Sequence, residues 1–187
     1  MRRLPLILLA IAVLSACGSS SPTASPTTDT SSAQQLSSPL WDKAGPNPSK
    51  SAKMVCEPEA RRDIAATLGI KATRVTAPTW VQAQHLYSCT YVYPHGRITL
   101  HVKELVDEDT TTAYFNGVRK KYGTTQQLIG LGQGAWILKN NDVVVRKDYK
   151  VLLVDVQGIP PSFAPAMTRS DVATNIGVAI MGCWTGA

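Results

Sequence analysis

Three segments of the chain carry apolar residues three or four positions apart, which is the spacing of one face of a helix. The apolar positions are Ala60, Ile64 and Leu68 in the first segment, Tyr114, Val118 and Tyr122 in the second, and Val172, Ile176, Ala179 and Ile180 in the third. Residues that favour helix ends flank these segments: Pro58 and Gly69; Asp107, Asp109 and Gly123; and Ser170 or Asp171. The pattern therefore predicts three helices.

Alternation of apolar and polar residues predicts strands in other parts of the chain. Residues 86–93 alternate in this way, with Tyr87, Cys89, Tyr91 and Tyr93 on one face and Ser88 and Thr90 on the other. The turn at 94–96 leads to a second strand at 97–106, with Ile98, Leu100 and Val102 on its inner face. Three short strands are predicted at 136–139, 143–146 and 149–156, and a proline-rich loop at 159–169.

The order of these elements predicts the fold class. Helices and strands that do not alternate regularly favour an α+β domain, here an antiparallel sheet of about five strands with about three helices packed on it. The predicted domain covers residues 51–187, a normal length for one domain with one hydrophobic core.

The first residues of the chain do not belong to this fold. Arg2 and Arg3 precede an apolar run from Leu4 to Val13, which is typical of an export signal over residues 1–16. A membrane-spanning helix is the alternative, but the run to Ala16 is well short of the roughly 20 residues that a span requires. The tetrapeptide Leu14-Ser15-Ala16-Cys17 resembles the lipobox of bacterial lipoproteins. That resemblance implies cleavage after Ala16, a lipid on Cys17, and an anchor on the extracytoplasmic face of the cell membrane.

The lipidated Cys17 begins a predicted disordered tether that extends to residue 50. Ser, Thr and Pro fill 18 of the 33 positions from Gly18 to Lys50, so little of the segment can be buried.

The mature chain is expected to carry a small net positive charge, which only weakly indicates the kind of partner. The formal charge of +6 counts 19 basic residues, and loss of Arg2 and Arg3 with the signal leaves 17 against 13 acidic residues, or +4. The two densest basic groups are Arg119 to Lys121 and the set Arg146, Lys147 and Lys150. They could attract anionic headgroups, although a solvated helix face and hairpin explain them as well. Nucleic acid is not expected as a partner outside the membrane.

Cysteine usage predicts one disulfide bond. With Cys17 lipidated, Cys56, Cys89 and Cys183 are left in an oxidising setting. We expect Cys56 to pair with Cys89, because the first lies at the start of a helix and the second in the next strand. Cys183 would then be a free, buried thiol.

Patterns that suggest catalysis or metal binding have simpler explanations. The run Gly130 to Ala135 matches a dinucleotide-binding pattern, but it precedes a predicted strand and not a helix, so a bend entering the sheet is the better interpretation. The residues that could be recruited to a metal site are His85, His95, His101 and Cys89, and surface positions explain the histidines. The acidic residues that could act in hydrolysis or bind calcium are Glu104, Asp107, Glu108 and Asp109, and a solvated strand end and helix start need the same residues. We expect no metal and no cofactor.

The candidate binding face is aromatic. Tyr87, Tyr91 and Tyr93 share one side of a strand, with Trp80 and Trp136 as neighbours, and amphipathic rings are suited to line a groove. The alternative is that the same rings form the core under a helix.

The whole pattern resembles the small lipoproteins of unknown function found in actinobacteria. The shared features are the lipobox, the Ser/Thr/Pro tether, Cys56, Cys89 and the glycine-rich turn. The resemblance brings no catalytic residue with it, so the chain is expected to be a non-catalytic binding module for an envelope lipid, a cell-wall fragment or a protein partner. The alternatives are a hydrolase that acts on envelope polymers and an accessory subunit of a membrane complex.

Overall fold

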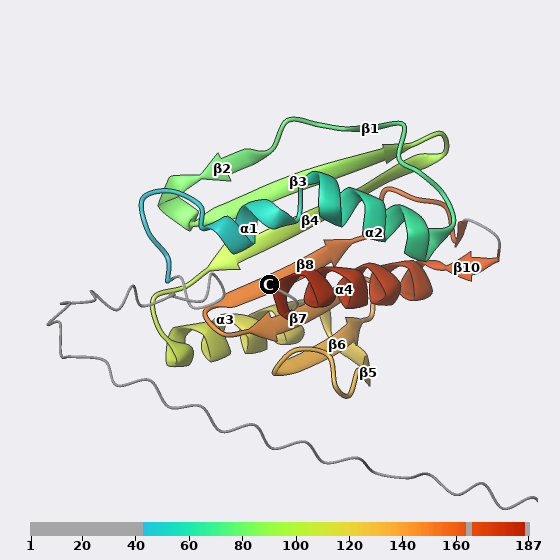
Figure 1. The fold of residues 1–187 in the computed structure, drawn as a ribbon. Coiled ribbons are helices and arrows are strands. Elements are labelled where there is room, and N and C mark those ends of the chain that lie inside the picture. Colours follow the sequence, from blue (N-terminus) through green and yellow to red (C-terminus); the bar gives the residue numbers. More distant parts are fainter. Residues whose placement is uncertain (1–42, 164–165, 186–187) are drawn as a thin grey trace, which may run out of the picture. The chain divides into compact units, whose positions relative to one another are not determined.

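The computed structural model describes residues 43–163 and 166–185 (Figure 1). Its helices are α1 (Lys50–Met54), α2 (Pro58–Leu68), α3 (Glu108–Tyr122) and α4 (Arg169–Thr185). Its strands are β1 (Arg74–Val75), β2 (Thr79–Val81), β3 (Leu86–Tyr93), β4 (Gly96–Glu104), β5 (Thr124–Gln127), β6 (Gly134–Leu138), β7 (Val143–Lys147), β8 (Lys150–Asp155), β9 (Ser162–Phe163) and β10 (Met167–Thr168). The predicted export signal, Cys17 and most of the predicted tether lie outside the described residues.

One antiparallel sheet organises the domain. Its strands follow the order β1-β3-β4-β8-β7-β6-β5, and β2 also pairs with β3, whereas β9 and β10 form a separate two-stranded ribbon. The predicted α+β class is confirmed. The sheet contains more strands than the five expected, because β1, β2 and β5 are too short or too polar to produce a recognisable alternation.

The inner face of the sheet carries the main core. α2 and α4 lie side by side across this face (Figure 1). Beneath them, β3 contributes its tyrosines and Cys89, and the central strands contribute aliphatic side chains. α2 and α4 turn their apolar residues toward the sheet, as the periodicity predicted: Ile64 and Leu68 from α2, and Ile176 and Ile180 from α4. On the other side of the sheet, Val118 and Tyr122 of α3 pack as predicted, but Tyr114 is 39% exposed and Phe115 is buried in its place.

The outer face of the sheet is covered over only part of its width. α3 packs across β6, β7 and β8, where Phe115 joins a small cluster with Leu138, Val144 and Val151. The remaining outer surface of β3 and β4 is half-exposed. We call it the open half: it comprises Ser88, Thr90, Val92, Arg97, Thr99, His101 and Lys103.

A disulfide bond joins the start of α2 to the middle of the sheet, as predicted. Cys56 and Cys89 are linked with their Cα atoms 5.7 Å apart and 33 positions apart in sequence. In the chain-entropy model, a closed loop of this length contributes roughly 3 to 4 kcal/mol to the free energy of unfolding. Cys183 is the free buried cysteine among the described residues.

The last residues assigned to the tether are part of the domain. The Ala44 amide donates to the Leu105 carbonyl, and the Ser49 side chain caps α1 by accepting from the Ala52 amide. The Ser49 amide also lies 3.3 Å from both carboxylate oxygens of Glu104. Glu104 is only 1% exposed, so its interpretation as a solvated strand end was wrong: the segment before α1 covers it.

The glycine-rich run forms a bend that leads into β6, as predicted. Gly130 and Gly132 adopt positive φ angles of 79° and 60°. A Cβ atom on Gly132 would lie 2.5 Å from the Arg146 carbonyl oxygen, so the close approach of the loop to β7 requires glycine at this position.

Candidate ligand-binding grooves

The predicted aromatic face is not a single surface. Tyr87, Tyr91 and Tyr93 are 5%, 2% and 3% exposed, because α2 and α4 cover the inner face on which they lie. Trp80 is a half-buried neighbour on β2, directly opposite Tyr87. Trp136 lies on the other side of the sheet in the cluster under α3, where the Arg119 guanidinium stacks 4.2 Å from its ring centre. The tyrosines are therefore core residues, and the grouping with Trp136 was wrong.

A groove nevertheless opens at the edge of this tyrosine layer, between α2 and the chain that leads into β1. We call it the α2 groove, and its volume is about 550 Å³, within the range of small-molecule sites. Its lining residues are Pro58, Arg61, Arg62 and Ala65 of α2, residues 71–75, and Tyr91 and Tyr93 of β3. The α2 residues follow helical spacing on the side that faces away from α4, so one helix contributes both to the core and to the groove.

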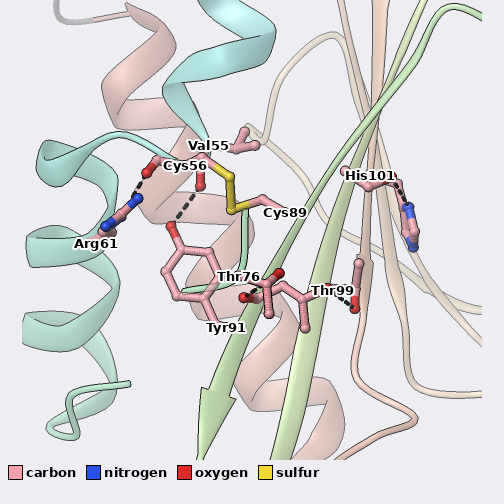
Figure 2. The surroundings of a disulfide bond; sticks show 10 residues. Val55, Cys56, Arg61, Thr76, Cys89, Tyr91, Thr99 and His101 are labelled. Carbon is pink, nitrogen blue, oxygen red and sulfur yellow. Dashed lines mark hydrogen bonds between the residues drawn. A yellow bond between two sulfur atoms is a disulfide. The ribbon is translucent and has the colours of Figure 1, made fainter. Parts of the chain in front are cut away.

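Four cationic residues line the α2 groove: Arg61, Arg62, Lys71 and Arg74. The Arg61 Nε atom donates to the Cys56 carbonyl at 2.7 Å, which holds this side chain beside the disulfide (Figure 2). Within the described part of the chain, none of the four forms an ion pair, and no carboxylate lines the groove. The groove is therefore a concentration of positive charge with apolar walls.

Two tyrosines form the floor of the α2 groove, and they differ in whether the hydroxyl has a hydrogen-bond partner. The Tyr91 hydroxyl donates to the Val55 carbonyl at 2.6 Å (Figure 2). The Tyr93 hydroxyl is buried without a partner among the described residues, while its ring packs edge-on against Phe163 at 5.1 Å. Burial raises the pKa of Tyr93 to about 12, so this hydroxyl keeps its proton and stays a hydrogen-bond donor.

A second groove lies on the open half of the outer face. We call it the sheet-face groove; its volume is about 660 Å³, and its lining residues are Arg74, Thr76, Thr90, Val92, Tyr93, Gly96, Arg97 and Gly158. It shares Arg74 and Tyr93 with the α2 groove. The two grooves therefore meet at the short β1 edge of the sheet.

His101 lies farther along the open half, as the sequence predicted for the outer face. Its Nδ1 atom is 2.8 Å from the Ser88 hydroxyl oxygen across the β3–β4 pair. Burial lowers the pKa of His101, and Asp155 and Asp142 oppose this shift in part. His101 also lines a small cavity of about 180 Å³ against α3, with Leu86, Lys103, Tyr114, Val118, Val151 and Leu153.

The other charged groups singled out in the sequence serve local structure. Asp107 caps α3 by accepting from the Thr110 amide at 2.7 Å, and Glu108 lies 3.5 Å from Arg146. Arg119 stacks on Trp136 and Lys150 is buried, whereas Lys120 and Lys121 are exposed on α3. In the described ranges no three His, Cys, Asp or Glu side chains come together in a way that would hold a metal ion.

Sequence reasoning missed the basic lining of the α2 groove. Arg61, Arg62, Lys71 and Arg74 fall within 14 positions, so a local excess of basic residues was visible in the sequence. They come from a helix, a loop and a strand, and only the pairing of β1 with β3 brings them around one cavity.

Among the described residues, no helix has both the length and the apolar character needed to cross a membrane. Comparisons of the chain with protein-family models, with curated proteins and with solved structures give no significant match.

Proposed function

We propose that this chain is a lipid-anchored, non-catalytic binding module of the cell envelope, and that its α2 groove takes an acidic amphiphile. The anchor rests on the lipobox-like tetrapeptide that ends at Cys17. The ligand class rests on one observation, the four cationic residues that line a groove with apolar walls.

The charge of the groove supports an anionic ligand for an energetic reason. Like charges gathered around a concave surface repel one another, and the described residues supply no carboxylate in the lining to offset this repulsion. A phosphate or carboxylate of the ligand would offset it, and arginine is well suited to bidentate contacts with either group. The apolar walls, formed by Pro58, Ala65, Ala72 and Val75, suit a hydrocarbon portion of the same molecule.

The surroundings of the Ser88–His101 pair support a binding module over a hydrolase. A serine nucleophile needs nearby donors that stabilise an oxyanion, and backbone amides are the usual source of them. On the face of a sheet, the backbone amides lie in the plane of the strands and form the hydrogen bonds between them. Here β4 is paired on both sides, with β3 and with β8.

An accessory subunit of a membrane complex would need an exposed apolar patch for its partner. The exposed large apolar residues come from separate parts of the chain: Val81, Val106, Tyr114, Ile129 and Val178.

Calorimetric titration with matched short-chain lipids tests the proposal. Residues 36–187 are suitable, because this segment contains every helix, every strand and the whole core of the described part of the chain. We expect dihexanoyl phosphatidic acid to bind at one site, and at least tenfold more tightly than dihexanoyl phosphatidylcholine, which has the same acyl chains without the net charge.

Two double variants distinguish the groove from general charge attraction. Replacing Arg62 and Arg74 with alanine should weaken binding of the phosphatidic acid at least tenfold. Replacing Lys120 and Lys121 with alanine removes the same charge from α3 and should leave the affinity unchanged. Equal affinity for the two lipids, or equal losses in the two variants, would contradict the proposal.

A further inference from the structure

Two arginines lie in one row across the end of the sheet. Arg74 of β1 is directly opposite Val92 of β3, and Val92 is directly opposite Arg97 of β4. Residues that face each other in a ladder point to the same side, so both arginines flank Val92 on the open half. Two strand spacings separate them by roughly 10 Å between Cα atoms.

The row connects the two grooves. Arg74 and Tyr93 line both of them, and Arg97 lines only the sheet-face groove. A molecule held in the α2 groove can therefore continue around the β1 edge without leaving a cationic lining.

The described residues do not neutralise this row. Neither arginine forms an ion pair in the described ranges, and no carboxylate lines the sheet-face groove there. The nearest carboxylate by register is Asp155, which lies opposite Thr99 in the next row, where it accepts from the Gln157 amide. Thr76 and Thr90 add hydroxyl groups beside the arginines.

We propose that the row of Arg74, Val92 and Arg97 is a second anion subsite, and that the ligand is an acidic lipid whose headgroup carries a second anionic group. This inference rests on the proposed function. The first anionic group and the hydrocarbon occupy the α2 groove, and the headgroup crosses the β1 edge, so that its distal anion contacts Arg97. The threonine hydroxyls beside the row contact the polar atoms between the two anions.

A series of lipids with equal dihexanoyl chains tests the second subsite by calorimetric titration of residues 36–187. Phosphatidic acid has no headgroup beyond its phosphate, phosphatidylinositol adds a polyol, and phosphatidylinositol 4-phosphate adds a second anion. We expect the last to bind about tenfold more tightly than phosphatidylinositol, the gain from one charge-assisted contact. Arg97→Ala should abolish that gain and leave the affinity for phosphatidic acid unchanged. Lys120→Ala removes one exposed charge from α3 and should change neither affinity.

The outcomes separate this inference from the proposed function. If phosphatidic acid binds but the two inositol lipids bind equally, or if Arg97→Ala weakens all three lipids alike, the second subsite is refuted and the α2 groove proposal stands. If phosphatidic acid does not bind, both are refuted. Soluble inositol 1,4-bisphosphate should bind at least tenfold more weakly than the lipid with the same headgroup; equal affinity would refute a lipid ligand and assign the site to a free phosphorylated polyol.

Discussion

The two faces of the β3–β4 hairpin differ sharply, although both strands alternate with the same regularity. The inner face carries Cys89, the tyrosines and the aliphatic residues of β4, all almost inaccessible under α2 and α4. The outer face carries hydroxyl groups, His101 and two positively charged side chains, and it stays half-exposed because α3 packs mainly across β6, β7 and β8. Alternation produces both faces, and the position of the helices decides which of them meets solvent.

The comparison shows where a ligand can be recognised in this domain. Large aromatic rings are the usual candidates for binding, but here they stabilise the core beneath two helices. The proposed function assigns recognition to the edge where the two faces meet, because there Arg74 and Tyr93 line the grooves of both sides.

The largest expected difference between the two faces is in how much a substitution lowers the free energy of unfolding. Leu100 is fully buried on the inner face of β4, and its neighbour Thr99 is half-buried on the outer face. We expect Leu100→Ala to lower the free energy of unfolding by about 3 to 5 kcal/mol, since it leaves a cavity in the core. Thr99→Ala should cost less than about 1 kcal/mol. Chemical denaturation of the two variants measures both, and similar losses would mean that the faces are not differently packed.

A smaller difference is expected between two tyrosines of the inner face. Tyr91→Phe deprives the buried Val55 carbonyl of its donor and should cost about 1 to 2 kcal/mol of unfolding free energy. Tyr93→Phe removes a buried hydroxyl that has no partner among the described residues, so the stability should stay the same or rise slightly. Thermal or denaturant unfolding distinguishes them. A large loss for Tyr93→Phe would show that its hydroxyl has a structural partner.

The smallest expected effect is a pH dependence from the outer face. Burial lowers the pKa of His101, so the folded state binds a proton less readily than the unfolded chain, whose histidine titrates near 6.5. Stability should therefore decrease as the pH falls from above that value toward the lower pKa of the folded state. His101→Gln should reduce the loss measured between about pH 7.5 and pH 5.5. An unchanged pH dependence in this variant would assign the effect to other groups.

Much of the local structure could be predicted because its signals are local. β3 has the predicted bounds, Asp107 caps α3, and Gly69 and Gly123 end α2 and α3. The pairing of Cys56 with Cys89 was also predictable, since it joins a helix start to the next long strand. The short strands β1, β2 and β5 were not predictable, because two to four residues carry too little periodicity and their conformation depends on a neighbouring strand.

The sequence by itself determined the helix and strand periods, the turn positions, the disulfide pairing and the α+β class, because these depend on residues close together or on simple alternation. Only the tertiary structure decided that the tyrosines lie in the core, that Glu104 is buried, and that the outer face of β3 and β4 is open. The tertiary structure also forms the α2 groove. Only when β1 pairs with β3 do α2, residues 71–75 and Tyr93 come to line one cavity. The physical reason is that an alternating strand has two equivalent faces until a helix covers one of them, and long-range packing selects which face that is.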